Sequence, residues 1–266
     1  FKEVINRKIK KVPSLRDVTI ANLFFENSTR TKISFELAQK RLSADVINFS
    51  SSASSVSKGE TLIDTVNNIL SMKVDMIVMR HPSPGASVFL SKNVDSCIIN
   101  AGDGNSEHPT QTIIDGFTIY NFFNKKLTNL RVTLVGDLKN GRTVKSLVKL
   151  LNRFENNHFN LVSPKDLSLS SDLPESYYET SDINEVLKET DILYVTRVQK
   201  ERGSVHDYSL TLKQLESLPE NSIVMHPFPR VSEIPVEFDI DKRAKYFDQI
   251  RYGVWCRQIL LERVMK

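Results

Sequence analysis

The feature that most constrains the fold is an alternation of strand-like and helix-like segments through almost the whole chain. Short apolar runs alternate with longer stretches whose apolar residues recur at helical spacing. This pattern predicts an α/β fold with mostly parallel sheets flanked by helices. The expected strands are 20–25, 46–49, 76–79, 97–100, 131–135, 159–162, 192–195 and 223–225, and the clearest expected helices are 32–42, 110–123 and 254–264.

The strands fall into two sets, which predicts two doubly wound domains. A polar connector with two lysines, 124–129, separates the sets. We therefore expect one domain over 1–124 and a second over 125–251, with the C-terminal helix, 252–266, packing back on the first. A chain of 266 residues that is 40% apolar and 26% charged is long enough to form two cores.

Composition excludes several classes of protein. The chain has 36 basic and 32 acidic residues, and a net charge of +4 is too small for a nucleic-acid-binding footprint. No apolar run approaches the roughly 20 residues of a membrane helix, and 1–11 lacks a signal-peptide core, so we expect a cytoplasmic protein that does not bind membranes. Cys97 and Cys256 stand far apart in apolar stretches, which predicts neither a disulfide framework nor a cysteine metal site.

A phosphate site is predicted at Ser28-Thr29-Arg30-Thr31, where an apolar strand gives way to a helix. Hydroxyl groups and a guanidinium there join the unpaired N–H groups and the positive dipole end of the helix, a combination that binds a dianionic phosphate. The alternative is an ordinary N-cap, because Ser and Thr are common capping residues. Arg30 favours the phosphate, since a cation in the first turn opposes the dipole unless an anion is bound.

Two further polar clusters of the first half follow strands, where open α/β sheets bind their ligands. Arg80 and His81 come directly after the strand 76–79. His108 and Gln111 stand three positions apart at a helix start, so both side chains are expected to point the same way and to grip a carbonyl group. The alternative for such a histidine is a cap or a surface position.

The second half carries three clusters. The segment 136–143 has the spacing of a nucleotide-binding P-loop, but Arg142 replaces the required lysine, and the arginine fork suits a carboxylate better. Arg197 follows the strand 192–195. In His226-Pro227-Phe228-Pro229 the two prolines leave neighbouring carbonyl groups with few backbone partners, so these carbonyls are candidate acceptors for an N–H-rich ligand. Ordinary turns are the alternative for both of the latter segments.

Taken together, these segments resemble the carbamoyltransferase family over residues 24 to about 261. Residues 25–31 resemble its carbamoyl phosphate loop, and 79–82 and 108–111 resemble its other signatures. The ornithine branch shares the phosphate loop but usually carries His-Cys-Leu-Pro near the end. His226-Pro227-Phe228-Pro229 has no cysteine, and 136–143 with 196–199 resembles the catalytic chains of the aspartate branch. Phe228 stands where leucine is commoner.

The resemblance implies transfer of the carbamoyl group of carbamoyl phosphate to the amine of L-aspartate. The products would be N-carbamoyl-L-aspartate and phosphate, an early step of de novo pyrimidine biosynthesis, with no metal and no cofactor. It also implies a homotrimer whose active sites lie between the domains and at subunit interfaces. An ornithine carbamoyltransferase and a catalytically silent carbamoyltransferase-like subunit remain the alternatives, and the sequence leaves open whether regulatory chains or fusion partners attach.

The resemblance also implies the role of each site residue. The residues that it places closest to the reaction are Arg30, Thr31, Lys58, Arg80 and His108. The full substrate-binding set is Ser28, Thr29, Arg30, Thr31, Ser55, Lys58, Arg80, His108, Gln111, Arg142, Arg197, Gln199, Pro227 and Phe228. Ser55 lies in the serine-rich segment 50–57, and Lys58 follows it directly. By composition this segment is a solvated loop. The resemblance implies that the loop serves the site of a neighbouring subunit.

Two places in the sequence are shorter than the resemblance implies. The chain begins inside what resembles the family's first helix, and Arg202-Gly203 passes quickly into a helical stretch at 211–218. Family members usually carry a longer loop at the second place, between Arg202-Gly203 and that helical stretch. We therefore expect residues of the natural protein to be missing at both places.

Overall fold

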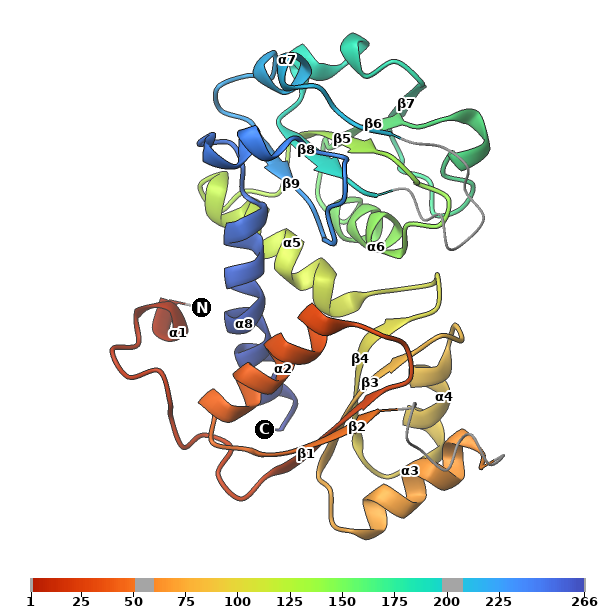
Figure 1. Ribbon diagram of the computed structural model, residues 1–266, viewed down its shortest axis with the longest axis vertical. Helices are drawn as coiled ribbons and strands as arrows, with labels where there is room; N and C mark the ends of the chain where they lie inside the picture. The colour runs from red at the N-terminus through yellow and green to blue at the C-terminus, as the bar shows by residue number, and fades with distance from the viewer. Residues whose placement is uncertain (1, 51–59, 198–207, 266) are drawn as a thin grey trace. The chain divides into compact units, whose positions relative to one another are not determined.

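The computed structural model of the chain describes residues 2–50, 60–197 and 208–265 (Figure 1). Its contacts divide the chain into two compact units, Phe1–Thr110 with Arg251–Lys266 (unit 1) and Gln111–Ile250 (unit 2). Both units are α/β structures with a parallel sheet between helices, as the alternation of segments predicts. Among the described residues, no helix is both long enough and apolar enough to cross a membrane.

Unit 1 contains a sheet of four parallel strands in the order β2-β1-β3-β4. The first expected strand runs along the centre of the sheet, where Ile20 pairs with Val46 on one side and with Met76 on the other. The strands are β1 (Thr19–Phe24), β2 (Asp45–Ser50), β3 (Met76–His81) and β4 (Cys97–Asp103).

Helices cover both faces of this sheet (Figure 1). Phe35 and Ala38 of α2 pack with Ile20 and with Leu261 of the C-terminal helix on one face. On the other face, apolar side chains of α3 and α4 pack against Ile77. The helices are α1 (Lys2–Asn6), α2 (Thr29–Arg41), α3 (Leu62–Ser71), α4 (Ala86–Asn93) and, from Arg251 on, α8 (Tyr246–Val264).

Unit 2 contains a sheet of five parallel strands in the order β7-β6-β5-β8-β9. Apolar clusters on its two faces include Leu134 and Tyr194 in one and Val135 and Val195 in the other, as the alternation of side chains along a strand requires. The strands are β5 (Arg131–Val135), β6 (His158–Val162), β7 (Tyr177–Thr180), β8 (Ile192–Val195) and β9 (Ile223–Met225).

The helices of unit 2 are α5 (Pro109–Phe122, from Gln111 on), α6 (Arg142–Leu151) and α7 (Leu212–Glu216), with 3-10 turns at Lys165–Leu167, Ile183–Glu185, Leu187–Glu189 and Val236–Ile240. We expected the domains to divide after residue 124, behind α5. The contacts group Gln111–Ile250 as unit 2, because later residues of α5 such as Ile119 pack in its core, and the boundary after residue 124 stays a prediction.

Two elements differ from the sequence expectation. Strand β7 was not expected, because its side chains are mostly exposed and it lies at the edge of the sheet, so it carries no apolar signal. Helix α8 begins at Tyr246 rather than near Val254. Its first turns contain polar residues that weaken an apolar pattern, yet one of them, Gln249, is buried and makes hydrogen bonds through both its Oε1 and its Nε2.

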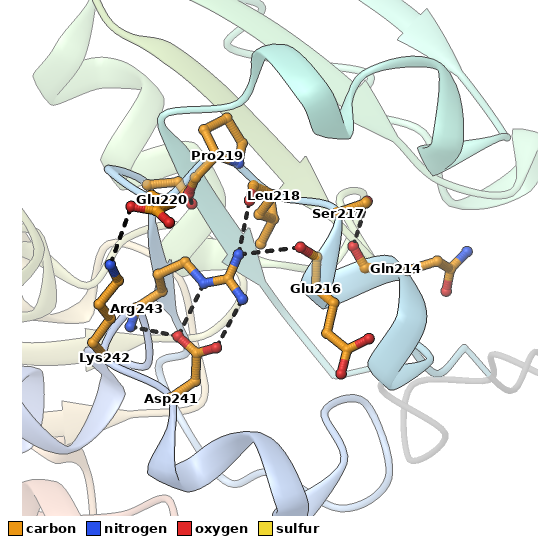
Figure 2. A network of polar contacts seen from close by, with 10 residues as sticks. Gln214, Glu216, Ser217, Leu218, Pro219, Glu220, Asp241, Lys242 and Arg243 are labelled. Atoms are coloured by element: carbon orange, nitrogen blue, oxygen red, sulfur yellow. Dashed lines mark hydrogen bonds and ion pairs between the residues drawn. The ribbon is translucent and has the colours of Figure 1, made fainter.

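A buried arginine ties two segments of unit 2 together, its own segment 241–243 and the end of α7 (Figure 2). The guanidinium of Arg243 donates to both carboxylate oxygens of Asp241, at 2.9 and 2.7 Å, which lowers the pKa of that carboxyl group. It also donates to the carbonyl oxygen of Leu218 at 2.7 Å and to that of Glu216 at 3.4 Å, just after α7. Arg243 therefore satisfies carbonyl groups that the end of a short helix leaves without intrahelical partners.

Replacing Arg243 with alanine should lower the free energy of unfolding by about 2–4 kcal/mol, because a partly buried carboxylate and two carbonyl groups lose their donor. Urea denaturation measures this loss. The matched control is Lys242→Ala, which removes an ion pair with Glu220 whose two side chains are 70% and 88% exposed, and should cost less than about 1 kcal/mol. Equal losses for the two variants would contradict the role of Arg243.

Candidate active site

The predicted phosphate loop opens helix α2. Ser28 is the N-cap, with extended backbone (φ −159°, ψ 95°), and its side chain makes no capping hydrogen bond to its own helix. The helical ladder begins with the N–H of Lys32, which donates to the Ser28 carbonyl at 3.2 Å, so the N–H groups of 29–31 precede the ladder. Thr31 is buried, whereas Thr29 and Arg30 are exposed. This helix end presents N–H groups and hydroxyl groups of the kind that bind a phosphate.

Parallel pairing brings the predicted Arg80 next to this loop. Phe24, the last residue of β1, pairs in register with Arg80 on β3, and the N–H of Phe25 donates to the Arg80 carbonyl at 2.9 Å. The loop that leads to α2 therefore starts directly beside Arg80. The Arg80 residue is only 8% exposed, so its charge is held inside the protein near the carboxyl ends of the strands.

His108 completes this cluster from the end of the neighbouring strand. It is buried and directly precedes α5, and its Nε2 lies 3.5 Å from Arg80 Nη1. Its Nδ1 lies 3.4 Å from the hydroxyl of Thr110. Arg80 also donates to the Ala101 carbonyl at 3.4 Å. The guanidinium and the imidazole are thus placed as a pair that can stabilise negative charge on a carbonyl or phosphate oxygen.

Sequence reasoning missed two carboxylates of this cluster. Glu26 Oε1 accepts from Arg80 Nη2 at 3.3 Å, so an anion already faces the guanidinium. Asp103 is buried and accepts from the N–H groups of Gly85 and Glu107, at 2.9 and 3.0 Å, which shapes the turn before His108. Glu26 lies in the predicted carbamoyl phosphate loop, 25–31, but the sequence does not show that its carboxylate faces Arg80.

His81, beside Arg80 in the sequence, has a different role. Its Nδ1 accepts from the N–H of Ser83 at 3.0 Å, and its ring lies edge-on to Phe25, with the centroids 5.3 Å apart. Burial lowers its pKa, which favours the neutral ring. The structure therefore shows His81 as a packing and turn residue.

In unit 2, the predicted arginines follow two adjacent parallel strands, β5 and β8. Gly136, after β5, has φ +112°, and a Cβ there would lie 2.3 Å from the carbonyl oxygen of Thr196. Only glycine permits this approach. The loop that leads to Arg142 and the segment that leads to Arg197 are therefore in direct contact at one edge of the sheet.

The geometry of 136–142 shows why it is not a P-loop. Its N–H groups have acceptors within the protein: Leu138 and Lys139 donate to the Leu167 carbonyl, and Asn140 donates to the carboxylate of Asp137 at 3.0 Å. These N–H groups are not turned toward a phosphate. Arg142 is the first residue of α6 and is 8% exposed. Its guanidinium, rather than the backbone of the loop, is the candidate group for binding an anion.

The segment His226-Pro227-Phe228-Pro229 follows β9, which pairs with β8. His226 is buried, and its Nδ1 accepts from the N–H of Phe228 at 2.8 Å. Phe228 has φ +54°, an unusual value for a residue with a side chain, and its peptide bond to Pro229 is cis. The Phe228 ring packs against His226 and Tyr246, at 5.3 and 5.8 Å between centroids.

Beyond this segment, Arg230 pairs with both oxygens of Asp239 and lowers the pKa of that carboxyl group.

Gln111, the remaining described residue of the predicted set, lies in the first turn of α5 and donates its amide N–H to Asp115 at 2.8 Å. Ser55, Lys58 and Gln199 lie outside the described residues, as does the proposed break at Arg202-Gly203. Within the described part of the chain, His, Cys, Asp and Glu side chains form no group of three that could ligate a metal ion.

Comparison with known proteins gives two matches that together span nearly the whole chain. Residues 1–121 match the carbamoyl-P binding domain of aspartate/ornithine carbamoyltransferase, and residues 128–264 match the Asp/Orn binding domain. The chain is 48% identical to the aspartate carbamoyltransferase catalytic subunit of Christiangramia forsetii, with 98% of this chain and 87% of that protein covered.

Solved structures are also similar. The catalytic subunit of M. jannaschii aspartate transcarbamoylase has a TM-score of 0.89 at 40% identity, with 99% of this chain and 90% of that chain covered. The Trypanosoma cruzi aspartate transcarbamoylase in complex with carbamoyl phosphate and aspartate has a TM-score of 0.88 at 37% identity, with 95% and 86% covered. The chain therefore belongs to the aspartate/ornithine carbamoyltransferase family.

Proposed function

We propose that this chain transfers the carbamoyl group of carbamoyl phosphate to the amine of L-aspartate, giving N-carbamoyl-L-aspartate and phosphate. The observation that carries the proposal is the buried pair Arg80 and His108, 3.5 Å apart, beside the loop that opens α2. A helix N-terminus and a buried guanidinium suit the phosphate, and the Arg80–His108 pair suits an acyl oxygen that becomes negative. Carbamoyl phosphate carries both groups.

The choice of aspartate as acceptor is supported by two observations. The catalytic subunits of Christiangramia forsetii and Archaeoglobus fulgidus that resemble the chain, at 48% and 44% identity, are both named for aspartate. In addition, Arg142 and Arg197 follow adjacent strands of unit 2. Two arginines suit the two carboxylates of aspartate, whereas ornithine has one carboxylate and a cationic side chain.

Each residue of the described set then has a role. Ser28, Thr29, Arg30 and Thr31 bind the phosphate, and Arg80 bridges the phosphate and the carbonyl oxygen. Thr31 and His108 also face that oxygen. Gln111 Oε1 and the carbonyl groups of Pro227 and Phe228 accept hydrogen bonds from the carbamoyl NH₂. Arg142 and Arg197, with Gln199, bind the carboxylates of aspartate.

The mechanism uses orientation and charge stabilisation. The neutral amine of aspartate attacks the carbamoyl carbon, a tetrahedral intermediate forms, and phosphate leaves with a proton from the amine. Carbamoyl phosphate is already an activated acyl donor, so no covalent enzyme intermediate is needed. Effective molarities of about 10⁵–10⁸ M from orientation, and roughly 10²–10³ in rate for each oxyanion donor, account for a large acceleration.

We further propose a homotrimer in which Ser55 and Lys58 of one subunit complete the site of its neighbour. Exposed apolar side chains support association: Ile33 and Leu37, one helical turn apart on α2, are 58% and 38% exposed, and Phe89 on α4 is 50% exposed. A step of pyrimidine biosynthesis, a cytoplasmic location and the absence of any metal or cofactor requirement stay predictions. Attachment of regulatory chains or fusion partners stays open.

The reaction is tested by incubating the purified chain with carbamoyl phosphate and either L-aspartate or L-ornithine. We expect carbamoyl aspartate and no citrulline, because Arg142 and Arg197 select a dicarboxylate. Chromatographic separation of the products measures both. Citrulline as the main product would show that the acceptor was assigned to the wrong branch. Failure to form either product would support the silent-subunit alternative.

Replacing Arg30 with alanine should lower kcat/KM by more than about 10²-fold, since a charge-assisted contact to the transferred phosphate is lost. The melting temperature should stay unchanged, because Arg30 is exposed. Lys40→Ala is the matched control: Lys40 is a cation on the same helix, paired with Glu36 at 2.6 Å in its last turn, and its loss should leave kcat/KM within twofold. Near-normal activity of Arg30→Ala would remove the phosphate assignment.

The shared site predicts complementation between two inactive variants. Lys58→Ala and Arg80→Ala disable different parts of the site, so subunits mixed during refolding form some sites that lack neither residue. We expect each variant alone to be nearly inactive and the mixture to recover up to about a quarter of wild-type activity. A mixture as inactive as its parents, with trimers shown by light scattering, would assign Lys58 to the site of its own subunit.

A further inference from the structure

A buried carboxylate of unit 2, Asp115, joins several elements through hydrogen bonds. Asp115 lies on α5 and is 0% exposed. Its Oδ1 accepts from the side-chain amides of Gln111, at 2.8 Å, and Gln249, at 2.5 Å, and its Oδ2 accepts from the hydroxyl of Tyr194 at 2.8 Å. One carboxylate therefore contacts α5, the first turns of α8 and the centre of the sheet.

The hydrogen-bond partners fix the orientation of both glutamine amides. Gln111 donates from its NH₂ group to Asp115 Oδ1, so its Oε1 points away from that oxygen. Gln249 is fixed twice, because its Oε1 accepts from the backbone N–H of His226 at 3.1 Å, a group that only donates. The NH₂ of Gln249 therefore faces Asp115. Burial and the nearby charge of Asp115 raise the pKa of Tyr194, which keeps that phenol protonated as a donor.

The same network reaches the segment after β9. From Asp115 it passes through Gln249 to the N–H of His226, and the ring of His226 accepts from the N–H of Phe228 at 2.8 Å. These bonds fix the backbone on both sides of Pro227. The carbonyl groups of Pro227 and Phe228 are the acceptors that the proposed function assigns to the carbamoyl NH₂, together with Gln111 Oε1.

We propose that Asp115 is a positioning residue that orients the acceptors of the substrate NH₂ group, and so makes the protein prefer a carbamoyl over an acetyl group. The inference rests on the proposed function. Asp115 acts through Gln111 on one side and through Gln249 and His226 on the other. Preorganised acceptors need no rearrangement when the substrate binds, and an amide held in one orientation distinguishes an N–H donor from a methyl group.

Acetyl phosphate is the probe that separates this role from general stability, because it is carbamoyl phosphate with CH₃ in place of NH₂. Asp115→Asn keeps the shape of the side chain but replaces one acceptor oxygen with an NH₂ group. That group cannot accept a hydrogen bond from Gln111, Gln249 or Tyr194. We expect the dissociation constant for carbamoyl phosphate to rise about tenfold or more and that for acetyl phosphate to rise less than threefold. Isothermal titration of the full chain measures both constants.

Tyr194→Phe is the matched control. It removes one donor from the same carboxylate, deep in the same core, but leaves the contacts to Gln111 and Gln249 in place. Both dissociation constants should change less than threefold. A loss of the preference for carbamoyl phosphate in Tyr194→Phe as large as in Asp115→Asn would overturn the positioning role, because it would follow from any disturbance of this core.

Gln249→Met provides a second route if Asp115→Asn does not fold. Methionine keeps the length of the side chain but disconnects Asp115 from the His226 N–H. It should weaken carbamoyl phosphate binding at least threefold with little change for acetyl phosphate. In addition, Asp115→Asn should have a smaller effect in a Gln111→Ala background than alone, since the two residues act on one acceptor.

The outcomes separate this inference from the proposed function. If the wild-type chain carbamoylates aspartate and prefers carbamoyl phosphate, but the Asp115 and Gln249 variants weaken both acyl phosphates equally, the function stands and the positioning role of Asp115 is wrong. If the wild-type chain neither carbamoylates aspartate nor prefers carbamoyl phosphate, both are wrong. A selective loss for carbamoyl phosphate supports both.

Discussion

The site depends on one constraint, the parallel pairing of strands. In a parallel sheet all carboxyl ends lie at one edge, so segments far apart in the sequence meet there. The register that pairs Phe24 with Arg80 places the loop before α2 beside a buried guanidinium. In the second sheet the pairing of β5 with β8 brings the segments that lead to Arg142 and Arg197 into contact. A register shift of one residue would turn these side chains to the opposite face.

Buried charge at such an edge must be balanced while no ligand is bound. Arg80 is 8% exposed, and an uncompensated charge at that depth would be costly. Glu26, at 3.3 Å, supplies the balancing charge. A bound phosphate would bring its own negative charge to the same guanidinium. Under the proposed function, the carboxylate of Glu26 would therefore compete with the phosphate for the guanidinium of Arg80.

Apolar periodicity was enough to predict eight of the nine strands that the described residues form, since buried strands carry a strong signal. The edge strand β7 and the first turns of α8 were missed because their side chains are exposed or polar. The same limit applies to the site. Arg80, His108, Arg142 and Arg197 could be predicted as site residues from their place at or after the ends of strands. Glu26, Asp115 and Gln249 could not, because their importance lies in which partner each one faces, and this follows from tertiary packing that a sequence pattern does not contain.

Two helix starts of similar sequence show how local hydrogen bonds decide what a site binds. Before α6, the N–H groups of Leu138, Lys139 and Asn140 are already satisfied by protein acceptors, so these three backbone donors are not turned toward a phosphate. Arg142, the first residue of α6, carries a guanidinium whose fork matches a carboxylate. Before α2, Ser28 makes no capping bond, and the N–H groups of 29–31 precede the helical ladder. The backbone and the side chains there suit a dianionic phosphate together. The hydrogen bonding of the two loops therefore supports the proposed assignment of the phosphate to the start of α2 and of a carboxylate to the start of α6.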